Sequence, residues 1–252
     1  EADRAEIQTA LSGVPEKLPE QFAKEDFAIP GLSSKLEQIQ SNLEHGSGAC
    51  FIRGLDLPNL TTEASQKLFW GLMCHIGTPV SQSADGARIF SVRDEGFKMG
   101  DTQARGPNTS KKLSFHTDRC DVISFLTLKQ AKSGGENQLV SSMYLFNEIG
   151  TRRPDLLEAL QQPFYYLRHN VDQGNEKPWC RQPIFSLYDN HFACNFLRVL
   201  IERAANSDDL PSLSDEQTEA LDFLEEVAAE PDNHVTLDRK STRLNSSHLV
   251  IS

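Results

Sequence analysis

Apolar residues recur at helical spacing in several parts of the chain. Leu36, Ile39 and Leu43 lie on one face of a helix that follows a polar start at Ser33 and ends near Gly46. We expect residues 1–45 to form a polar, helical N-terminal extension. The same spacing, with Ser, Pro or Thr at the start of each run, predicts further helices over residues 62–75, 142–149, 153–160 and 214–227.

Short apolar runs between these helices predict strands. The clearest is residues 122–128, which are followed by Gly134-Gly135 and a second run over 138–141, so we expect a hairpin or a jelly-roll pair here. Residues 76–109 are rich in Gly, Ser, Asp and Arg and predict loops and short strands. Further strands are predicted over residues 49–54, 164–168, 184–188 and 191–193.

Composition indicates one soluble domain over residues 1–238. The chain has 252 residues, 38% of them hydrophobic, and a formal net charge of −11 without any stripe of Lys or Arg. Nucleic acid is therefore not an expected partner. No apolar run approaches the length needed to cross a bilayer, and the first residues lack the pattern of a secretory signal, so no membrane partner is expected either.

The cysteines indicate a reducing compartment. There are five, widely spaced and without a C-x-x-C pair, which argues against a disulfide framework and a thiolate zinc site. We expect a cytoplasmic protein. Trp70 and Trp179 share no periodic pattern and are interpreted as core or rim aromatics.

His116 and Asp118 are the candidate metal ligands. They are two residues apart directly before a predicted strand, so in extended backbone their side chains leave the same face. An imidazole and a carboxylate, joined by a second histidine, make the facial triad that leaves three positions of Fe(II) open. The alternative is a histidine capped by a neighbouring Asp at a turn, since H-x-D alone is a weak motif.

A longer set of segments surrounds this pair and raises its specificity. The segments include Phe115-His116-Thr117-Asp118-Arg119-Cys120-Asp121-Val122, Ala131-Lys132-Ser133-Gly134-Gly135-Glu136-Asn137, Val140-Ser141-Ser142 and Phe146-Asn147-Glu148, with weaker agreement at Gly54-Leu55, Gly77-Thr78-Pro79-Val80-Ser81-Gln82, Arg153-Pro154-Asp155 and Lys177-Pro178-Trp179. In this order they resemble the taurine-dioxygenase family of Fe(II)/2-oxoglutarate oxygenases. The resemblance covers roughly residues 46–238.

The resemblance implies a mainly β fold with flanking helices, a double-stranded β-helix or jelly roll with an iron site at its open end. It implies that His116 and Asp118 are the first two iron ligands. Asn137 stands where the family carries a Thr or Ser that helps hold 2-oxoglutarate, although a polar turn residue explains it equally well. The implied reaction hydroxylates a small polar or anionic molecule with O₂, while 2-oxoglutarate is decarboxylated to succinate.

The chain departs from the family pattern after residue 238. The basic, polar tail over residues 239–252 resembles a non-native, adapter-derived fusion, so we expect the last strands of the jelly roll to be missing. The distal histidine and arginine of the family are not found. The other histidines are not assigned to the metal (His45, His75, His169, His191, His234 and His248), and no arginine among Arg168, Arg181 and Arg198 is preferred for binding a carboxylate.

Two other functions stay open at this point. The first is a non-catalytic jelly-roll binding protein in which His116 and Asp118 are a structural pair or hold a metal without turnover. The second is an inactive, truncated fragment of the enzyme. Substrate identity and oligomeric state are not predicted, because the family's substrate pockets are built from variable loops.

Overall fold

The computed structural model describes residues 1–14, 16–55, 59–82, 86–92, 113–129, 136–168 and 176–237, and the backbone of Ser246–Ile251. The chain divides into two compact units. Unit 1 is built from Glu1–Ser110, Cys120–Gly135 and Arg239–Ser252, and unit 2 from Lys111–Arg119 and Glu136–Asp238. The single domain over residues 1–238 stays a prediction.

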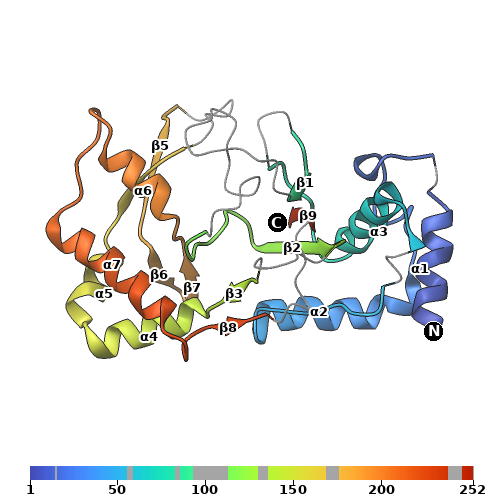
Figure 1. Ribbon diagram of the computed structural model, residues 1–252, viewed down its shortest axis with the longest axis horizontal. Coiled ribbons are helices and arrows are strands. Elements are labelled where there is room, and N and C mark those ends of the chain that lie inside the picture. Colours follow the sequence, from blue (N-terminus) through green and yellow to red (C-terminus); the bar gives the residue numbers. More distant parts are fainter. Residues whose placement is uncertain are drawn as a thin grey trace. The chain divides into compact units, whose positions relative to one another are not determined.

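Unit 1 begins with the predicted helical extension. Its helices are α1 (Ala2–Ser12), α2 (Ser33–His45) and α3 (Thr62–Cys74), joined in part by short 3-10 turns at Pro19–Gln21 and Pro30–Leu32 (Figure 1). Thr61 caps α3 because its hydroxyl accepts a hydrogen bond from the Ala64 amide at 3.1 Å. The predicted bounds of α2 and α3 are confirmed to within a residue.

The core of unit 1 forms where α3 meets the loops that follow α1. Trp70 is buried and its indole nitrogen donates to the Phe22 carbonyl at 2.8 Å, which confirms its prediction as a core aromatic. Gly71 lies against the ring of Phe27, where a Cβ atom would come within 2.4 Å of a ring carbon. A side chain at this position would therefore push the helix away from the ring.

One three-stranded antiparallel sheet belongs to unit 1. Its order is β1 (Ile89–Val92), β9 (Ser246–Ile251) and β2 (Val122–Thr127), with Phe90 and Phe125 both opposite His248. The C-terminal segment thus lies in the centre of the sheet, which is consistent with its apolar end forming a small strand. Its adapter-derived origin stays a prediction.

The strand predicted over residues 49–54 is wrong. This segment has no strand, and Phe51 and Ile52 are 49% and 42% exposed. Gly48 and Gly54, with φ of 70° and 87°, turn the backbone at both sides of the run. An apolar run becomes a strand only where a neighbour completes its hydrogen bonds, and within the described residues this run has none.

Unit 2 contains four helices within the described residues, α4 (Ser142–Arg152), α5 (Pro154–Leu160), α6 (Arg198–Ala205) and α7 (Asp215–Ala229). Pro154 is at the first helical position, as predicted. At the start of α7 the hydroxyl of Ser214 accepts from the Gln217 amide, and the Gln217 side chain accepts from the Ser214 amide. Helix α6 was not predicted.

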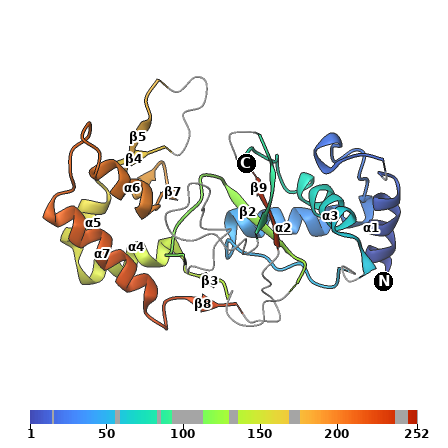
Figure 2. The same ribbon diagram turned by 45° about the horizontal axis from the view of Figure 1, so that its top comes forward.

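The described strands of unit 2 make three antiparallel pairs. They are β3 (Gln138–Leu139) with β8 (Val235–Thr236), β4 (Phe164–Leu167) with β5 (Trp179–Gln182), and β6 (Phe185–Tyr188) with β7 (His191–Cys194). Helix α6 packs beside β4 (Figure 2). Asp189 and Asn190 make the tight turn between β6 and β7 at positive φ.

The hairpin expected between residues 122–128 and 138–141 is wrong, because β2 pairs with β9 and β3 pairs with β8. Gly134-Gly135 lies outside the described residues. The fold therefore mixes helices with antiparallel strands, and a jelly roll without its last strands stays a prediction at this point. In the described part of the chain no helix is long and apolar enough to span a membrane.

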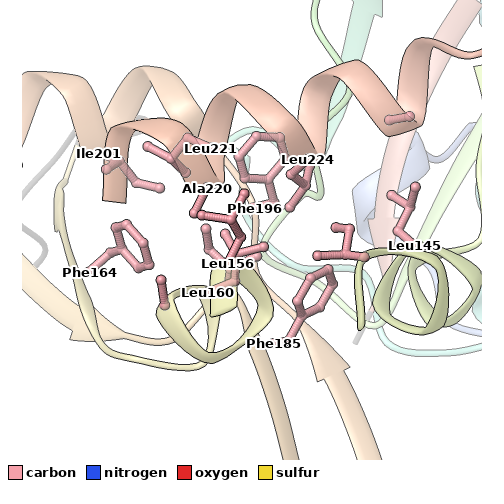
Figure 3. Close-up of a cluster of buried hydrophobic side chains, with 14 of the residues drawn as sticks. Leu145, Leu156, Leu160, Phe164, Phe185, Phe196, Ile201, Ala220, Leu221 and Leu224 are labelled. Carbon is pink, nitrogen blue, oxygen red and sulfur yellow. The ribbon is translucent and has the colours of Figure 1, made fainter. Parts of the chain in front are cut away.

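The core of unit 2 lies between α7, α5 and the strands. Phe196 is 3% exposed and lies among Leu156, Ala220 and Leu224 (Figure 3). Phe115, directly before the candidate ligands, packs against the same cluster from its edge. Burial of these side chains stabilises the unit by roughly 1.5–3 kcal/mol for each large apolar residue. The core therefore fixes the backbone to which the candidate site is attached.

Candidate metal centre

His116 and Asp118 are both exposed, in a segment of unit 2 without regular secondary structure. Phe115 and Thr117 are partly buried, whereas His116 and Asp118 are exposed, so burial alternates along the four residues. This alternation is what extended backbone produces, with successive side chains on opposite faces. The alternation fits the shared face that the H-x-D spacing predicts, although the segment is not a strand, and the role of both residues as metal ligands stays a prediction.

Two hydrogen bonds fix the buried side of this segment. The Thr117 amide donates to the Phe196 carbonyl at 2.7 Å, and the Phe196 amide donates to the Thr117 hydroxyl oxygen at 2.9 Å. The adjacent Asn195 amide donates to the Ile184 carbonyl at 2.8 Å, and its carbonyl accepts from the Tyr166 hydroxyl. Thr117 is therefore tied to backbone that the core already holds.

The side chain of His116 is oriented by the residue two positions before it. Its Nδ1 lies 2.8 Å from the Ser114 carbonyl oxygen. Because a carbonyl only accepts, Nδ1 carries the hydrogen, and the Nε2 of the neutral ring keeps a lone pair. This arrangement, with one ring nitrogen hydrogen-bonded and the other available, is the one in which histidine binds metals in proteins. His116 therefore fits a metal through Nε2.

The surroundings of Tyr166 are apolar on the side that faces the core. Burial raises the pKa of Tyr166, and the charge of Arg119 opposes that rise. Burial also raises the pKa of the Cys194 thiol to about 12. Both groups are neutral at physiological pH, so the backbone behind the candidate ligands adds no charge to the site.

Other described histidines use their ring nitrogens elsewhere. His234 Nδ1 lies 3.1 Å from the Ala228 carbonyl, and its Nε2 lies 2.9 Å from Gln138 Nε2. His75 and His191 each contact a backbone carbonyl. In the part of the chain that the structure describes, no three His, Cys, Asp or Glu side chains gather as a metal site. His169 and the His248 side chain lie outside the described residues.

Asn137 begins the chain that leads into β3. Its backbone carbonyl accepts from the Leu237 amide at 2.8 Å, which extends the β3–β8 pairing by one step, and the residue is exposed. The amide side chain is thus directed to solvent rather than into the core. Its predicted role toward 2-oxoglutarate stays a prediction.

The three arginines considered for carboxylate binding differ in their surroundings. Arg198 makes ion pairs of 2.6–2.8 Å with Glu202, Asp222 and Glu225. Its burial lowers the pKa of Arg198, but the hydrogen bonds to these carboxylates raise the pKa more, so the guanidinium stays charged. Its charge is already balanced by these acidic partners. Arg181 is exposed and lies over the Tyr165 ring at 5.5 Å. A different situation holds at the end of β4, at Arg168.

The Arg168 backbone amide donates to the Pro178 carbonyl at 2.7 Å. Its Nε atom is buried and has no hydrogen-bond partner among the described residues. A buried donor of this kind costs free energy unless a ligand or water satisfies it. Because side chains alternate along a strand, Arg168 follows Phe164 and Tyr166 on the buried face of β4.

A cavity of about 270 Å³ lies between β4, β5, α6 and the start of α7. Its lining includes the polar side chains of Arg181 and Gln217. Neither candidate ligand lines it, so this cavity is not the candidate metal centre.

The contacts of Phe115 and Thr117 were not predicted from the sequence, because H-x-D spacing carries no information about the residues that hold the two ligands in place.

Comparison with known proteins gives the chain its family. The model of the family described as taurine catabolism dioxygenase TauD, TfdA family, matches residues 15–241. FR-33289 synthase of Streptomyces rubellomurinus is 31% identical over 245 residues, which cover 94% of this chain and 71% of that protein. The taurine hydroxylase-like protein SAT17 of Stachybotrys chartarum is 28% identical, over 90% of this chain and 61% of that protein.

Solved structures of oxygenases share the fold. Asparagine oxygenase in complex with Fe(II), a hydroxyasparagine and succinate matches with a TM-score of 0.73 at 15% identity, over 100% of this chain and 83% of that one. The non-haem iron oxygenase OrfP, in complex with Fe and alpha-ketoglutaric acid, matches with a TM-score of 0.58 at 13% identity, over 98% and 83%. The chain is therefore an oxygenase that belongs to the TauD/TfdA family, whose enzymes use Fe(II), 2-oxoglutarate and O₂.

Proposed function

We propose that this chain is built to hydroxylate a small polar or anionic molecule, with 2-oxoglutarate decarboxylated to succinate. The observation that carries the proposal is the alternation along residues 115–118, which places His116 and Asp118 on one exposed face. Family membership supplies the cofactors, and the segment supplies two side chains of the types that a facial triad needs.

His116 would bind Fe(II) through Nε2 and Asp118 through its carboxylate. The bound ion would supply the redox chemistry that joins 2-oxoglutarate, O₂ and the substrate C–H bond. The protein's own residues hold the two ligands: the Ser114 carbonyl fixes the His116 ring, and Thr117 fixes the backbone between them. These groups determine where the ion sits before any substrate arrives.

A facial triad needs a third protein ligand, and this proposal assigns that position to no described residue. His234 is not proposed for it, because both of its ring nitrogens already have partners. His75 and His191 are not proposed either, because among the described residues no third ligand-type side chain gathers with His116 and Asp118. With two protein ligands instead of three, iron binding by residues 1–252 would be weak.

An anionic group of the cosubstrate or substrate would bind to Arg168. Its buried Nε has no partner among the described residues, whereas Arg198 is saturated by carboxylates. A guanidinium pairs with a carboxylate through two parallel hydrogen bonds, which would satisfy that nitrogen. Asn137 is retained as a second donor toward 2-oxoglutarate.

The substrate class is narrowed by the proteins with the same fold. Structures of this fold hold hydroxyasparagine or L-Arg, both small and polar with a carboxylate. We therefore propose an amino-acid-like substrate and no nucleic acid partner.

The five cysteines are free, which supports a reducing compartment such as the cytoplasm.

Turnover and metal binding test this proposal together. Residues 1–252 with Fe(II) and O₂ are incubated with 2-oxoglutarate and a panel of free amino acids, and succinate is measured. We expect His116→Ala and Asp118→Ala to abolish succinate formation and to weaken Fe(II) binding, while His191→Ala, a control in the same unit, leaves both unchanged. Fe(II) binding without succinate indicates the non-catalytic binding protein.

Retained turnover in His116→Ala would overturn the ligand assignment. A wild-type chain that neither binds Fe(II) nor unfolds cooperatively in urea indicates the inactive fragment. The unfolding curve is needed because exposed sheet edges promote aggregation, which would imitate the loss of a metal site.

A further inference from the structure

The ring of His234 is held from two sides. Its Nδ1 faces the Ala228 carbonyl of α7 at 3.1 Å, and its Nε2 faces the Gln138 side-chain nitrogen of β3 at 2.9 Å. A carbonyl only accepts and an amide nitrogen only donates, so Nδ1 carries the hydrogen and Nε2 accepts. Both nitrogens of a neutral ring are therefore engaged, and the plane of the ring is fixed.

This fixed ring lies against Phe115. The two ring centroids are 5.6 Å apart and the planes are tilted by 54°. Such an aromatic pair is stabilising beyond the area that it buries. Phe115 also packs against the core cluster of unit 2, so its side chain is confined between the core and His234. Phe115 is the residue directly before His116.

The residue directly after His116 is fixed as well. Thr117 exchanges two hydrogen bonds with Phe196, whose side chain is buried in the same core. Confining the backbone of a residue costs conformational entropy. Because the fold has already confined residues 115 and 117, ordering them does not weaken the binding of a metal ion at His116.

We infer that His234 is a positioning residue of the candidate iron site, which acts by holding Phe115 and so setting the direction of His116. This inference rests on the proposed role of His116 as an iron ligand. His234 does not bind the ion in this arrangement, because both of its nitrogens already have partners. It belongs to the shell that orients a ligand, a class of residue whose loss weakens metal binding about 10–100-fold.

Anaerobic Fe(II) titration distinguishes this role from the two alternatives. The variants are His234→Ala, His116→Ala and the control His191→Ala, an exposed histidine of the same unit. We expect His234→Ala to weaken Fe(II) binding about tenfold, far less than His116→Ala does. Unchanged affinity in His234→Ala overturns the inference, and a loss as complete as in His116→Ala overturns it in favour of His234 as a ligand.

A double variant tests whether the effect runs through the aromatic contact. Phe115→Leu keeps an apolar side chain against the core but removes the ring that His234 contacts. If both residues act through one contact, Phe115→Leu combined with His234→Ala binds Fe(II) no more weakly than His234→Ala alone. Independent effects that multiply in the double variant contradict a shared contact.

Hydrogen exchange in the metal-free protein gives a readout that does not depend on iron. The Thr117 amide donates to Phe196 and is expected to be protected in the wild type and in His191→Ala. We expect His234→Ala to lose this protection while the amides of α7 keep theirs. Unchanged protection of Thr117 overturns the inference. Because this measurement needs no Fe(II), it tests the inference even if the proposed function fails.

The same exchange measurement on Phe115→Leu covers the case in which His234→Ala does not fold. Phe115→Leu must also expose the Thr117 amide, because it removes the other half of the contact. A protected Thr117 amide in this variant contradicts the inference as directly as it does in His234→Ala.

Discussion

Thr117 and Phe196 are 79 residues apart in the sequence and exchange two hydrogen bonds, one from each backbone amide. Phe196 is part of the core of unit 2, whereas Thr117 separates the two candidate ligands. The candidate metal centre is thus attached to the core by the backbone of one buried residue. We therefore expect the stability of this unit and its affinity for the proposed metal to be coupled through that attachment.

Replacing Thr117 by Val removes the hydroxyl and keeps the shape of the side chain. Thr117→Val leaves the Phe196 amide without its acceptor, and an unsatisfied buried donor costs about 1–3 kcal/mol. We expect a loss of that size in the free energy of unfolding measured in urea, together with weaker Fe(II) binding. Thr117→Ser keeps the acceptor and serves as the control, and equal stability of Val and Ser variants contradicts the expectation.

Tyr166 supports the same attachment from β4. Its hydroxyl donates to the Asn195 carbonyl, directly before Phe196. Tyr166→Phe removes only this hydrogen bond, so we expect a loss of about 1 kcal/mol in the free energy of unfolding. The matched control is Tyr165→Phe on the neighbouring position of the strand, which is half-buried. A Tyr166→Phe variant as stable as Tyr165→Phe would show that the bond contributes nothing.

Arg198 joins α6 to α7 through three carboxylates. Glu202 belongs to its own helix, and Asp222 and Glu225 belong to α7. Arg198→Lys keeps the charge but not the planar fork that reaches three partners. We expect it to lower the free energy of unfolding by about 1–2 kcal/mol, between the values for exposed and buried pairs. This is measured by urea unfolding at low salt.

Arg153→Lys is the control for Arg198→Lys. Arg153 pairs with Asp155 and Glu219 at more exposed positions, so its replacement is expected to change stability by less than about 1 kcal/mol. Losses of equal size in the two variants contradict the view that Arg198 has a special place between the helices.

The positions of most helices and strands were predictable, but the pairing of the strands was not, and the reason is physical. The bounds of α2 follow from residues within it, namely the apolar face through Leu36 and Ile39 and the terminal Gly46. The run over residues 49–54 is apolar too, but it has no partner strand within the described residues, and β2 pairs with β9 from the far end of the chain. Strand pairing depends on residues far away, so local pattern cannot specify it.

For the candidate site, the two candidate ligands were predictable from the sequence, but the residues that position them were not. His116 and Asp118 are found from spacing and family resemblance, and Ser114 is close enough to have been considered. His234 was noted only as a histidine without a role. Its contact with Phe115 depends on the path of the chain after α7, which no motif encodes. Residues that position a ligand leave a weaker signal in sequence than the ligand itself.

Stability at alkaline pH provides a test of how deeply the backbone behind the site is buried. Burial raises the pKa of Cys194 from its ordinary value of 9.0 to about 12. Below pH 9 the thiol is protonated in both folded and unfolded chains and adds no pH dependence. Between pH 9 and 12 the unfolded chain releases this proton and the folded chain keeps it, so stability falls as pH rises.

Cys194→Ala removes this contribution. We expect the free energy of unfolding, measured in urea at several pH values from 8 to about 11 with a reducing agent, to fall less steeply in the variant. The difference in slope approaches about 1.4 kcal/mol per pH unit above pH 9. Tyr166 contributes to the decline in both proteins, because burial raises its pKa too. Cys50→Ala, at an exposed position, must keep the wild-type slope. Identical slopes in all three proteins would show that the partly buried Cys194 thiol is not shielded from water in solution.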